Sequence, residues 1–270
     1  MNREPMSAAA VQAALRSPND WQVRHVQQTR STNDDLARGT PESPQPVDGM
    51  VLVTEEQTAG RGRSGRDWSC PPGAGLMFSA KVAMGGIPPQ RRAWIGVALG
   101  LAVLHGFSRI LEVAGPTATL KWPNDVLVGG RKCGGILAEA IGESVVVGAG
   151  LNISLQEHEL PRADATSLVL AGVVEVNRNL LLATVLDHFG ELLADWRRAG
   201  GDVGASGLRV AYLRACSTLG SAVRLELPGD TMVTGTAVDV DADGAIVVEA
   251  LDGSRSRYSA GDVVHLRPAA

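Results

Sequence analysis

The sequence predicts an α+β fold, with a mixed sheet flanked by helices and a small β-barrel at the C-terminal end. Short runs rich in β-branched and apolar residues at 22–27, 50–57 and 76–83 are separated by loops of Gly, Pro and Ser. Longer segments with helical spacing of apolar residues lie between and after such runs. From residue 217 the chain changes to short alternating strands joined by turns, which is typical of a small barrel.

The individual elements follow from caps, breakers and periodicity. Helices are predicted at 7–16, from Ser31 or Thr32 to Gly39, from Pro88–Pro89 to about residue 113, from a cap at Asn177 to about Arg198, and at 205–215. Further strands of the sheet are predicted at 119–122, 133–141 and 144–154, and barrel strands at 223–227, 231–240, 245–251 and 256–261. We therefore expect two domains, 1–216 and 217–270.

Composition excludes several classes of protein. A chain of 270 residues that is 44% hydrophobic can bury a sizeable core, and its net charge of −4 gives no general affinity for nucleic acid. The longest apolar run, 93–104, is shorter than the roughly 20 residues of a membrane span. Three widely spaced cysteines fit no disulfide framework or CxxC site, so we expect a cytoplasmic protein.

The run GRGRSGR at 60–66 places three arginines among three glycines directly after a predicted strand. Guanidinium groups and unhindered backbone N–H groups can surround an anion, and phosphate is the expected one. Taken alone, the run also fits a flexible surface loop or an RGG-like tract that touches nucleic acid. It is neither a P-loop, since the Lys-Ser/Thr ending is absent, nor a Rossmann fingerprint, since no helix follows.

The run KWPNDVLV at 121–128 is the second candidate element. Pro123 ends a strand and directs Asn124 and Asp125 into a turn, where polar side chains can face a cleft. Lys121 and Lys132 bracket this turn, and lysines beside a carboxylate suit phosphoanhydride chemistry. An ordinary Asx turn with solvated lysines fits the same residues. No histidine pair has metal-ligand spacing, so no metal ligand is assigned.

Together these motifs resemble the biotin protein ligase family. GRGRSGR is similar to the adenylate-binding loop of that family, KWPNDVLV to its KWPND motif, and RKCGGILAE at 131–139 to its lysine-bearing strand, in the same order. The STN at 31–33, Trp68 and the GAGLN that ends in Asn152 extend the resemblance over residues 22–155. The resemblance implies the biotin and lipoate ligase fold, similar to class II synthetases, with an SH3-like terminal barrel.

The resemblance also implies a role for each matched position. Biotin would be bound by Ser31, Thr32, Asn33, Gln57, Gly60, Arg61, Gly62, Arg63, Lys132, Gly135 and Leu137. The nucleotide would be bound by Arg61, Arg63, Arg66, Trp68, Lys121, Asn124 and Asn152, and catalysis would use Arg63, Lys121, Asp125 and Lys132. Each position has a simpler reading as well: Ser31 and Thr32 as helix caps, Trp68 as a core aromatic, and Asn152 as a strand-end turn residue.

The implied reaction has two steps. ATP with Mg²⁺ activates biotin as biotinyl-5′-adenylate and releases pyrophosphate, and a lysine of a biotin carboxyl carrier domain then takes the biotin. The GRGRSGR segment at 60–66, called the arginine loop below, would be disordered without ligand and would close over the anhydride once it forms. Only about twenty residues precede the first strand, so we expect no DNA-binding domain and no repressor activity. Monomer and homodimer remain equally compatible with the sequence.

Two alternatives remain open. A lipoate or octanoate ligase or transferase shares the fold and the acyl-to-lysine chemistry, although it is not expected to carry both charged motifs. A nucleic-acid-binding module would use the loop arginines and the barrel, but two Tyr and three Phe offer few stacking groups.

Overall fold

A seven-stranded mixed sheet forms the centre of the molecule in the computed structural model, which describes residues 3–39, 47–112, 115–227, 231–259 and 261–265. The strand order is β1-β2-β5-β9-β8-β7-β6, and only β1 and β2 run parallel. The strands span β1 Gln22–Thr29, β2 Met50–Gln57, β5 Gly75–Ala83, β6 Ala118–Lys121, β7 Asp125–Val128, β8 Arg131–Ile141 and β9 Ser144–Asn152.

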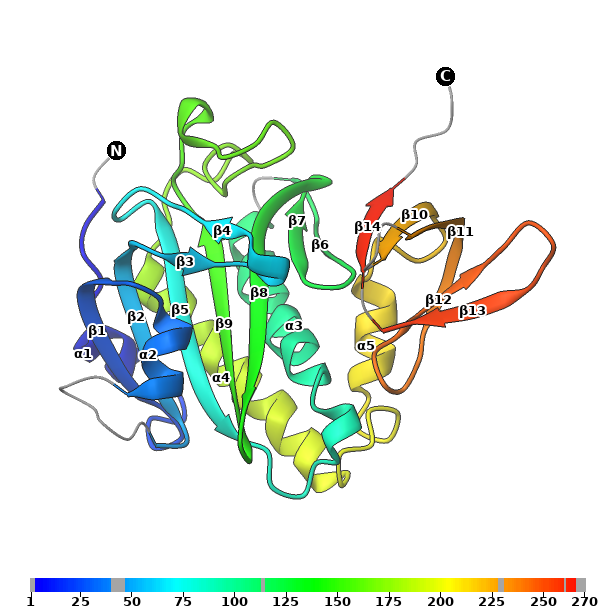
Figure 1. Cartoon of the computed structure of the whole chain (residues 1–270). Helices are drawn as coiled ribbons and strands as arrows, with labels where there is room; N and C mark the ends of the chain where they lie inside the picture. Colours follow the sequence, from blue (N-terminus) through cyan, green and yellow to red (C-terminus); the bar gives the residue numbers. More distant parts are fainter. Residues whose placement is uncertain (1–2, 40–46, 113–114, 228–230, 260, 266–270) are drawn as a thin grey trace.

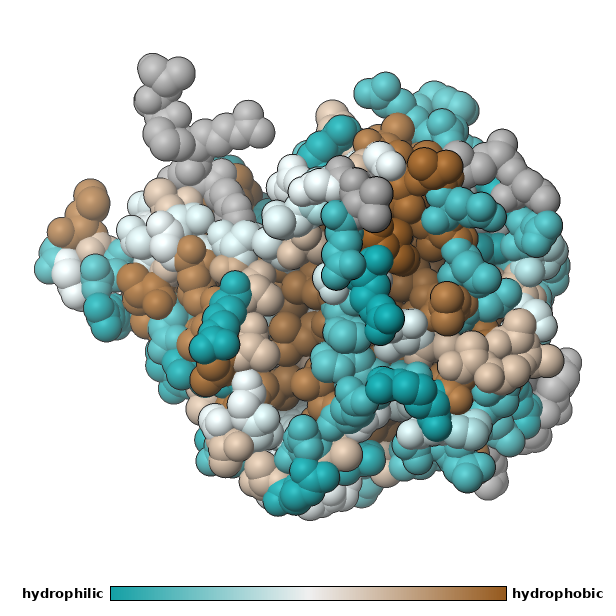
Figure 2. Space-filling view, turned by 180° about the vertical axis from the view of Figure 1, so that it is seen from behind, coloured by the Kyte–Doolittle hydropathy of each residue, from teal (hydrophilic) through white to brown (hydrophobic). Residues whose placement is uncertain are grey.

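Helices cover the sheet unequally (Figure 1). On the rear face lie α1 Ala8–Ala14, α3 Trp94–Leu111 and α4 Arg178–Arg198, and the main apolar core fills the space between these helices and the sheet. The front face carries the short helix α2 Thr32–Arg38 and a hairpin of β3 Gly60–Arg61 and β4 Asp67–Trp68. Figure 2 shows the rear, where hydrophilic and apolar side chains are interspersed. The front face is therefore the side left open for a ligand.

A second sheet follows α5 Leu208–Ala215 and has the order β13-β12-β11-β10-β14. Its strands are β10 Ala222–Leu227, β11 Thr231–Val240, β12 Ile246–Glu249, β13 Arg255–Tyr258 and β14 Asp262–His265, all antiparallel to their neighbours. This is the expected SH3-like unit. Two indole N–H groups join it to the part of the chain that forms the main sheet and its helices: Trp94 Nε1 at the start of α3 donates to the carbonyl of Ala242, and Trp122 Nε1, after β6, donates to that of Gly244.

Most predicted elements are confirmed, including the caps at Ser31 and Asn177 and the helix end at Gly39. The prediction was wrong about Asp125, which begins strand β7 directly after the turn, and it missed β14 and the β3–β4 hairpin. Pro89 begins a separate 3-10 turn and α3 itself begins at Trp94 and ends at Leu111; residue 113, the predicted end, lies outside the described residues. The missed strands are all short, and β14 alone among them pairs with a strand remote in sequence, β10.

The segment Pro89–Leu111 is long and apolar enough by length and composition to cross a membrane, with mean hydropathy 1.6. In the fold, 61% of its most apolar 18-residue window is buried inside the protein. Its apolar side chains, among them Trp94, Leu99 and Phe107, belong to the main core between the sheet and α4. We therefore interpret it as a core helix.

Candidate active site

A cavity of about 940 Å³ opens on the front face of the main sheet. Its floor is formed by β5, β8 and β9, and its rim by α2, the β3–β4 hairpin and the loop after β9. All of the residues predicted to bind ligand or to act in catalysis line it, except Gly60. Gly60 is buried in β3, where a side chain would overlap the Trp68 carbonyl oxygen and contact Gln57. Its contribution is thus to the packing of the hairpin.

Polar side chains gather at the end of the cavity under α2. Thr32 N–H donates to Gln57 Oε1 at 2.8 Å, and the hydroxyl oxygens of Thr32 and Ser79 lie 2.7 Å apart. Ser79 Oγ donates to Asn33 Oδ1 at 2.6 Å. Ser79 and Thr32 are both buried, so these groups depend on one another for hydrogen bonds until a ligand enters.

Gly148 allows these side chains to lie directly on the sheet. Strand pairing sets Gly148 of β9 between Ser79 of β5 and Leu137 of β8. A Cβ at residue 148 would overlap both Asn33 Oδ1 and Ser79 Oγ. The absence of a side chain at this position is therefore a requirement of the polar end of the cavity.

The arginine loop lies over the cavity as the tip of the β3–β4 hairpin. Gly62 N–H donates to the Arg66 carbonyl at 2.6 Å, and a 3-10 turn covers Arg63–Gly65. Ser64 within that turn has a φ of 56°, a left-handed conformation that is uncommon for a residue with a side chain. Arg61, Arg63 and Arg66 all line the cavity. The loop thus brings three guanidinium groups to one rim of the cavity.

Lys132 and Asp125 form an ion pair beside this rim, with Nζ and Oδ1 2.5 Å apart. A β-bulge in the β7–β8 pairing lies next to Lys132. Lys121, on β6, lines the same part of the cavity, and its burial lowers the pKa of its ammonium group. Asn124 Nδ2 donates to the carbonyl of Ile136 at 2.9 Å, which fixes the turn against β8. Cationic groups therefore surround the middle of the cavity.

Trp68 and Asn152 line the other end of the large cavity. The indole packs flat on β9, because Gly150 has no side chain that would overlap the ring. Trp68 Nε1 and Asn152 Oδ1 are buried and make no hydrogen bond within the described part of the chain, whereas Asn152 Nδ2 donates to the Thr166 carbonyl. A buried donor and a buried acceptor are thus available to a ligand.

Several lining residues were not predicted from the sequence. They include Phe78 and Ser79 on β5, the loop residues Pro161, Arg162, Asp164 and Ala165, and Glu226, Val263 and Val264 of the C-terminal sheet. A serine following the apolar residues Leu76–Phe78 in the predicted strand was the one signal available for Ser79. The loop and the C-terminal residues reach the cavity through tertiary packing alone.

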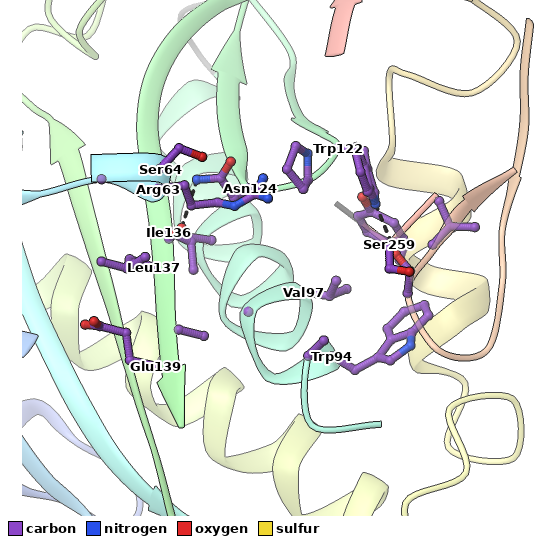
Figure 3. A pocket seen from close by; sticks show the side chains of 18 of the residues that line it. Arg63, Ser64, Trp94, Val97, Trp122, Asn124, Ile136, Leu137, Glu139 and Ser259 are labelled. Carbon is purple, nitrogen blue, oxygen red and sulfur yellow. Dashed lines mark hydrogen bonds between the residues drawn. The ribbon is translucent and has the colours of Figure 1, made fainter. Parts of the chain in front are cut away.

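A second cavity of about 540 Å³ lies on the other side of the arginine loop, between α3, β8 and the C-terminal sheet. Figure 3 shows Arg63, Ser64 and Asn124 at one end of it and Trp94 and Val97 at the other, with Ile136, Leu137 and Glu139 along β8. The two cavities share Arg61–Arg63 and Trp122–Asn124. The arginine loop therefore forms a partition between them.

The described residues contain no group of three His, Cys, Asp or Glu side chains that could hold a metal ion. Asp67, Asp125, Asp164 and Glu226 line the large cavity, but they do not form such a group, and Asp125 is already paired with Lys132. This arrangement does not fit a resident metal centre held by protein ligands alone.

Comparison with known proteins agrees with this geometry. The sequence profile described as "Biotin/lipoate A/B protein ligase family" matches residues 25–155, and that described as "Biotin protein ligase C terminal domain" matches residues 218–266. The chain is 41% identical to the biotin–[acetyl-CoA-carboxylase] ligase of Mycobacterium tuberculosis, over 91% of this chain and 90% of that protein. It is 30% identical to the bifunctional ligase/repressor of Bacillus subtilis, but spans only 65% of that protein.

Solved structures show the same fold. The biotin protein ligase from Aquifex aeolicus in complex with biotin and ATP superposes with a TM-score of 0.74 at 25% identity, covering 91% of this chain and 99% of that one. The ligase from Leishmania major in complex with biotinyl-5-AMP, at 22% identity and a TM-score of 0.59, supports the fold alone. With a family profile on each of its two sheets and 41% identity to a biotin ligase over nearly its full length, the chain belongs to the biotin protein ligase family.

Proposed function

We propose that this enzyme activates biotin with ATP as biotinyl-5′-adenylate, releases pyrophosphate, and then transfers biotin to a lysine of a biotin carboxyl carrier domain. The observation that carries the proposal is one cavity of about 940 Å³ whose polar end, cationic middle and indole end match the ureido ring, the acyl phosphate and the adenine in order. The names of the M. tuberculosis and A. aeolicus relatives support biotin and ATP as substrates.

The first step joins biotin to the nucleotide. A carboxylate oxygen of biotin attacks the α-phosphorus of ATP, and the bond from that phosphorus to pyrophosphate breaks. Arg63 and Lys132 neutralise the negative charge that grows on the phosphoryl oxygens, while Lys121, Arg61 and Arg66 contribute the surrounding positive field. Asp125 accepts from Lys132 at 2.5 Å and holds its ammonium group in one place.

The second step uses the reactivity of the mixed anhydride. The ε-amine of the carrier lysine attacks the acyl carbon, an amide forms, and AMP leaves. Positioning is the main contribution of the enzyme at this stage, since the anhydride is already activated and must be shielded from water. The arginine loop supplies this shield, and its three glycines allow it to open and close.

The two ends of the cavity select the two substrates. Ser31, Thr32, Asn33 and Gln57 face the ureido ring, and Gly135 and Leu137 of β8 form the wall along the acyl chain. Trp68 stacks on adenine, and the unpaired oxygen of Asn152 accepts from its exocyclic amino group. Asn124 supports the phosphate region from its turn.

Several wider assignments belong to the same proposal. Mg²⁺ enters as a complex with the ATP phosphates, since it keeps most of its water ligands and needs few from protein. Residues 1–216 form the catalytic domain and 217–270 the barrel domain, and the reaction takes place in the cytoplasm, which suits three free, buried cysteines. We further propose that this chain does not act as a repressor, and a specific operator footprint would contradict that.

Mass spectrometry of the reaction tests the proposal directly. The protein is incubated with Mg-ATP and either biotin, lipoate or octanoate, and acyl-adenylate is measured after removal of protein. We expect biotinyl-adenylate only. An adduct formed with lipoate or octanoate and not with biotin would refute the biotin assignment while leaving the fold and the anhydride chemistry intact.

A further inference from the structure

Glu139 connects the polar end of the cavity to the arginine loop. Its Oε2 accepts from Asn33 Nδ2 at 2.7 Å, and its two carboxylate oxygens accept from Arg61 Nη2 at 2.9 and 3.1 Å. The same guanidinium group also pairs with Asp34 of α2. Glu139 itself lines the second cavity and not the large one, so it acts on the large cavity through other residues.

The Glu139 carboxylate is the nearer of two acceptors for Asn33 Nδ2, the other being the Leu137 carbonyl at 3.4 Å, and it sets the direction of the hydrogen bonds in this series. A carboxylate only accepts, so the amide nitrogen of Asn33 must face Glu139 and its oxygen must face Ser79. Ser79 has one hydroxyl proton and donates it to that oxygen. Its own oxygen then accepts from the Thr32 hydroxyl, 2.7 Å away.

The hydroxyl of Thr32 can then only accept a hydrogen bond from a ligand, because its proton is donated to Ser79. Its hydroxyl lies 3.1 Å from Gln57 Oε1, and this oxygen already faces the Thr32 backbone N–H. Because the Thr32 proton is used by Ser79, two acceptors lie side by side on the cavity wall. An N–H donor of a ligand placed between them would satisfy both.

We infer that Glu139 is a positioning residue that orients the Asn33–Ser79–Thr32 hydrogen bonds so that the cavity offers acceptors to N–H donors, and that it ties this end to the loop through Arg61. The inference deepens the proposed function, on which it rests, because the ureido group of biotin carries two such N–H groups. Glu139 and Arg61 have side-chain exposures of 28% and 41%, and such pairs add little to stability. The contribution of Glu139 is therefore expected in ligand binding.

The variant Glu139→Gln keeps the shape of the side chain and removes both the charge and the fixed acceptor. We expect the Kd and KM for biotin to rise about tenfold, as for the loss of one or two hydrogen bonds, with the KM for ATP and kcat within about twofold of wild type. Dissociation of biotinyl-adenylate should accelerate about threefold or more, because Arg61 loses a charged partner.

A matched control lies on the same β8–β9 hairpin. Glu143 is 89% exposed and pairs with Arg92 at 3.0 Å, so Glu143→Gln removes a similar ion pair away from the cavity. This control variant should bind biotin and retain the adenylate like wild type.

A double variant separates the two roles of Glu139, which are to orient the Asn33–Ser79–Thr32 hydrogen bonds and to pair with Arg61. In Asn33→Asp combined with Glu139→Gln, the introduced amide can donate to the introduced carboxylate, which still accepts from Ser79. The direction of the hydrogen bonds is thus restored while position 139 stays uncharged. Biotin affinity should return to within about threefold of wild type, whereas adenylate dissociation should stay fast.

Three results would overturn the inference. One is an unchanged biotin KM in Glu139→Gln; another is an equal rise in the KM values for biotin and ATP together with a lower Tm, which marks a structural role. The third is a double variant that binds biotin no better than Glu139→Gln. If wild type itself forms no biotinyl-adenylate, the proposed function fails, whereas normal wild-type activity with an unaffected Glu139→Gln overturns this inference alone.

Discussion

Two arginine–carboxylate pairs of this molecule have the same chemistry and opposite surroundings. Glu55 and Arg178 are 2.8 Å apart with side-chain exposures of 2% and 8%, whereas Glu139 and Arg61 are 2.9 Å apart with exposures of 28% and 41%. Arg178 also donates to the carbonyls of Gly75 and Glu4, and Glu55 accepts from the Met6 N–H. The buried pair thus joins the N-terminal segment, α4 and the sheet.

The difference in burial separates the roles of the two pairs. Removing one partner of a buried pair leaves an uncompensated charge out of water, so the fold depends on it. The exposed pair is compensated by water when it opens, so it can break and re-form as a ligand enters. The Glu55–Arg178 pair therefore stabilises the fold, whereas the Glu139–Arg61 pair lies where the arginine loop can move.

The largest effect is expected from Arg178→Met. Loss of the guanidinium group leaves Glu55 buried without its permanent cation, although His25 Nε2 still lies 3.2 Å from it, and should lower the free energy of unfolding by about 3–5 kcal/mol in urea denaturation. Adding Glu55→Gln should recover part of that loss. A change below about 1 kcal/mol in the single variant would remove the contrast between the two pairs.

The variant Lys132→Ala tests a positive charge at the cavity, where the previous variant tested one in the core. We expect adenylate formation, measured by pyrophosphate exchange, to fall about 10²-fold or more, since a group that stabilises growing negative charge is lost. The free energy of unfolding should change by no more than about 1 kcal/mol, because the Lys132–Asp125 pair is partly exposed. Normal exchange would exclude Lys132 from the first step.

Arg63→Ala tests the loop as a shield for the anhydride. We expect biotinyl-adenylate to be released about tenfold faster, with weaker biotin binding and an unchanged fold by circular dichroism. The measurement is the dissociation rate of preformed adenylate, chased with excess unlabelled ligand. An unchanged rate would show that Arg63 does not retain the intermediate.

The smallest effect concerns pH and Lys121. Burial lowers the pKa of this lysine from its ordinary value of 10.5, so the ammonium group loses its proton, and its attraction for phosphate, at a lower pH than an exposed lysine. The alkaline limb of kcat/KM for ATP should therefore move to higher pH in Lys121→Arg. Folding stability, in contrast, should rise with pH between the lowered pKa of Lys121 and its ordinary value of 10.5, because the cost of burying the charge disappears once the folded protein has lost this proton. Identical alkaline limbs would contradict this assignment.

Local sequence was enough to predict many of the groups that line the large cavity. The glycine–arginine spacing of GRGRSGR, the Pro-Asn-Asp turn and the flanking lysines each indicate an anion-handling site, and the three arginines, the turn residues and both lysines line one cavity. The main strands and helices were also predictable, because apolar periodicity and caps act within a few residues. Strands β7 and β14 and the β3–β4 hairpin were missed, since segments of two to four residues give too little periodicity for a dependable strand assignment.

Tertiary structure alone decided how those groups cooperate. Asn33, Ser79 and Glu139 are far apart in the chain, and they meet because the register of β5, β9 and β8 sets Ser79, Gly148 and Leu137 in one row beneath α2. A shift of one residue in that register would turn each side chain to the opposite face of the sheet. The sequence determined which charged groups and hydroxyls this protein has, whereas strand register decided which of them form hydrogen bonds with one another.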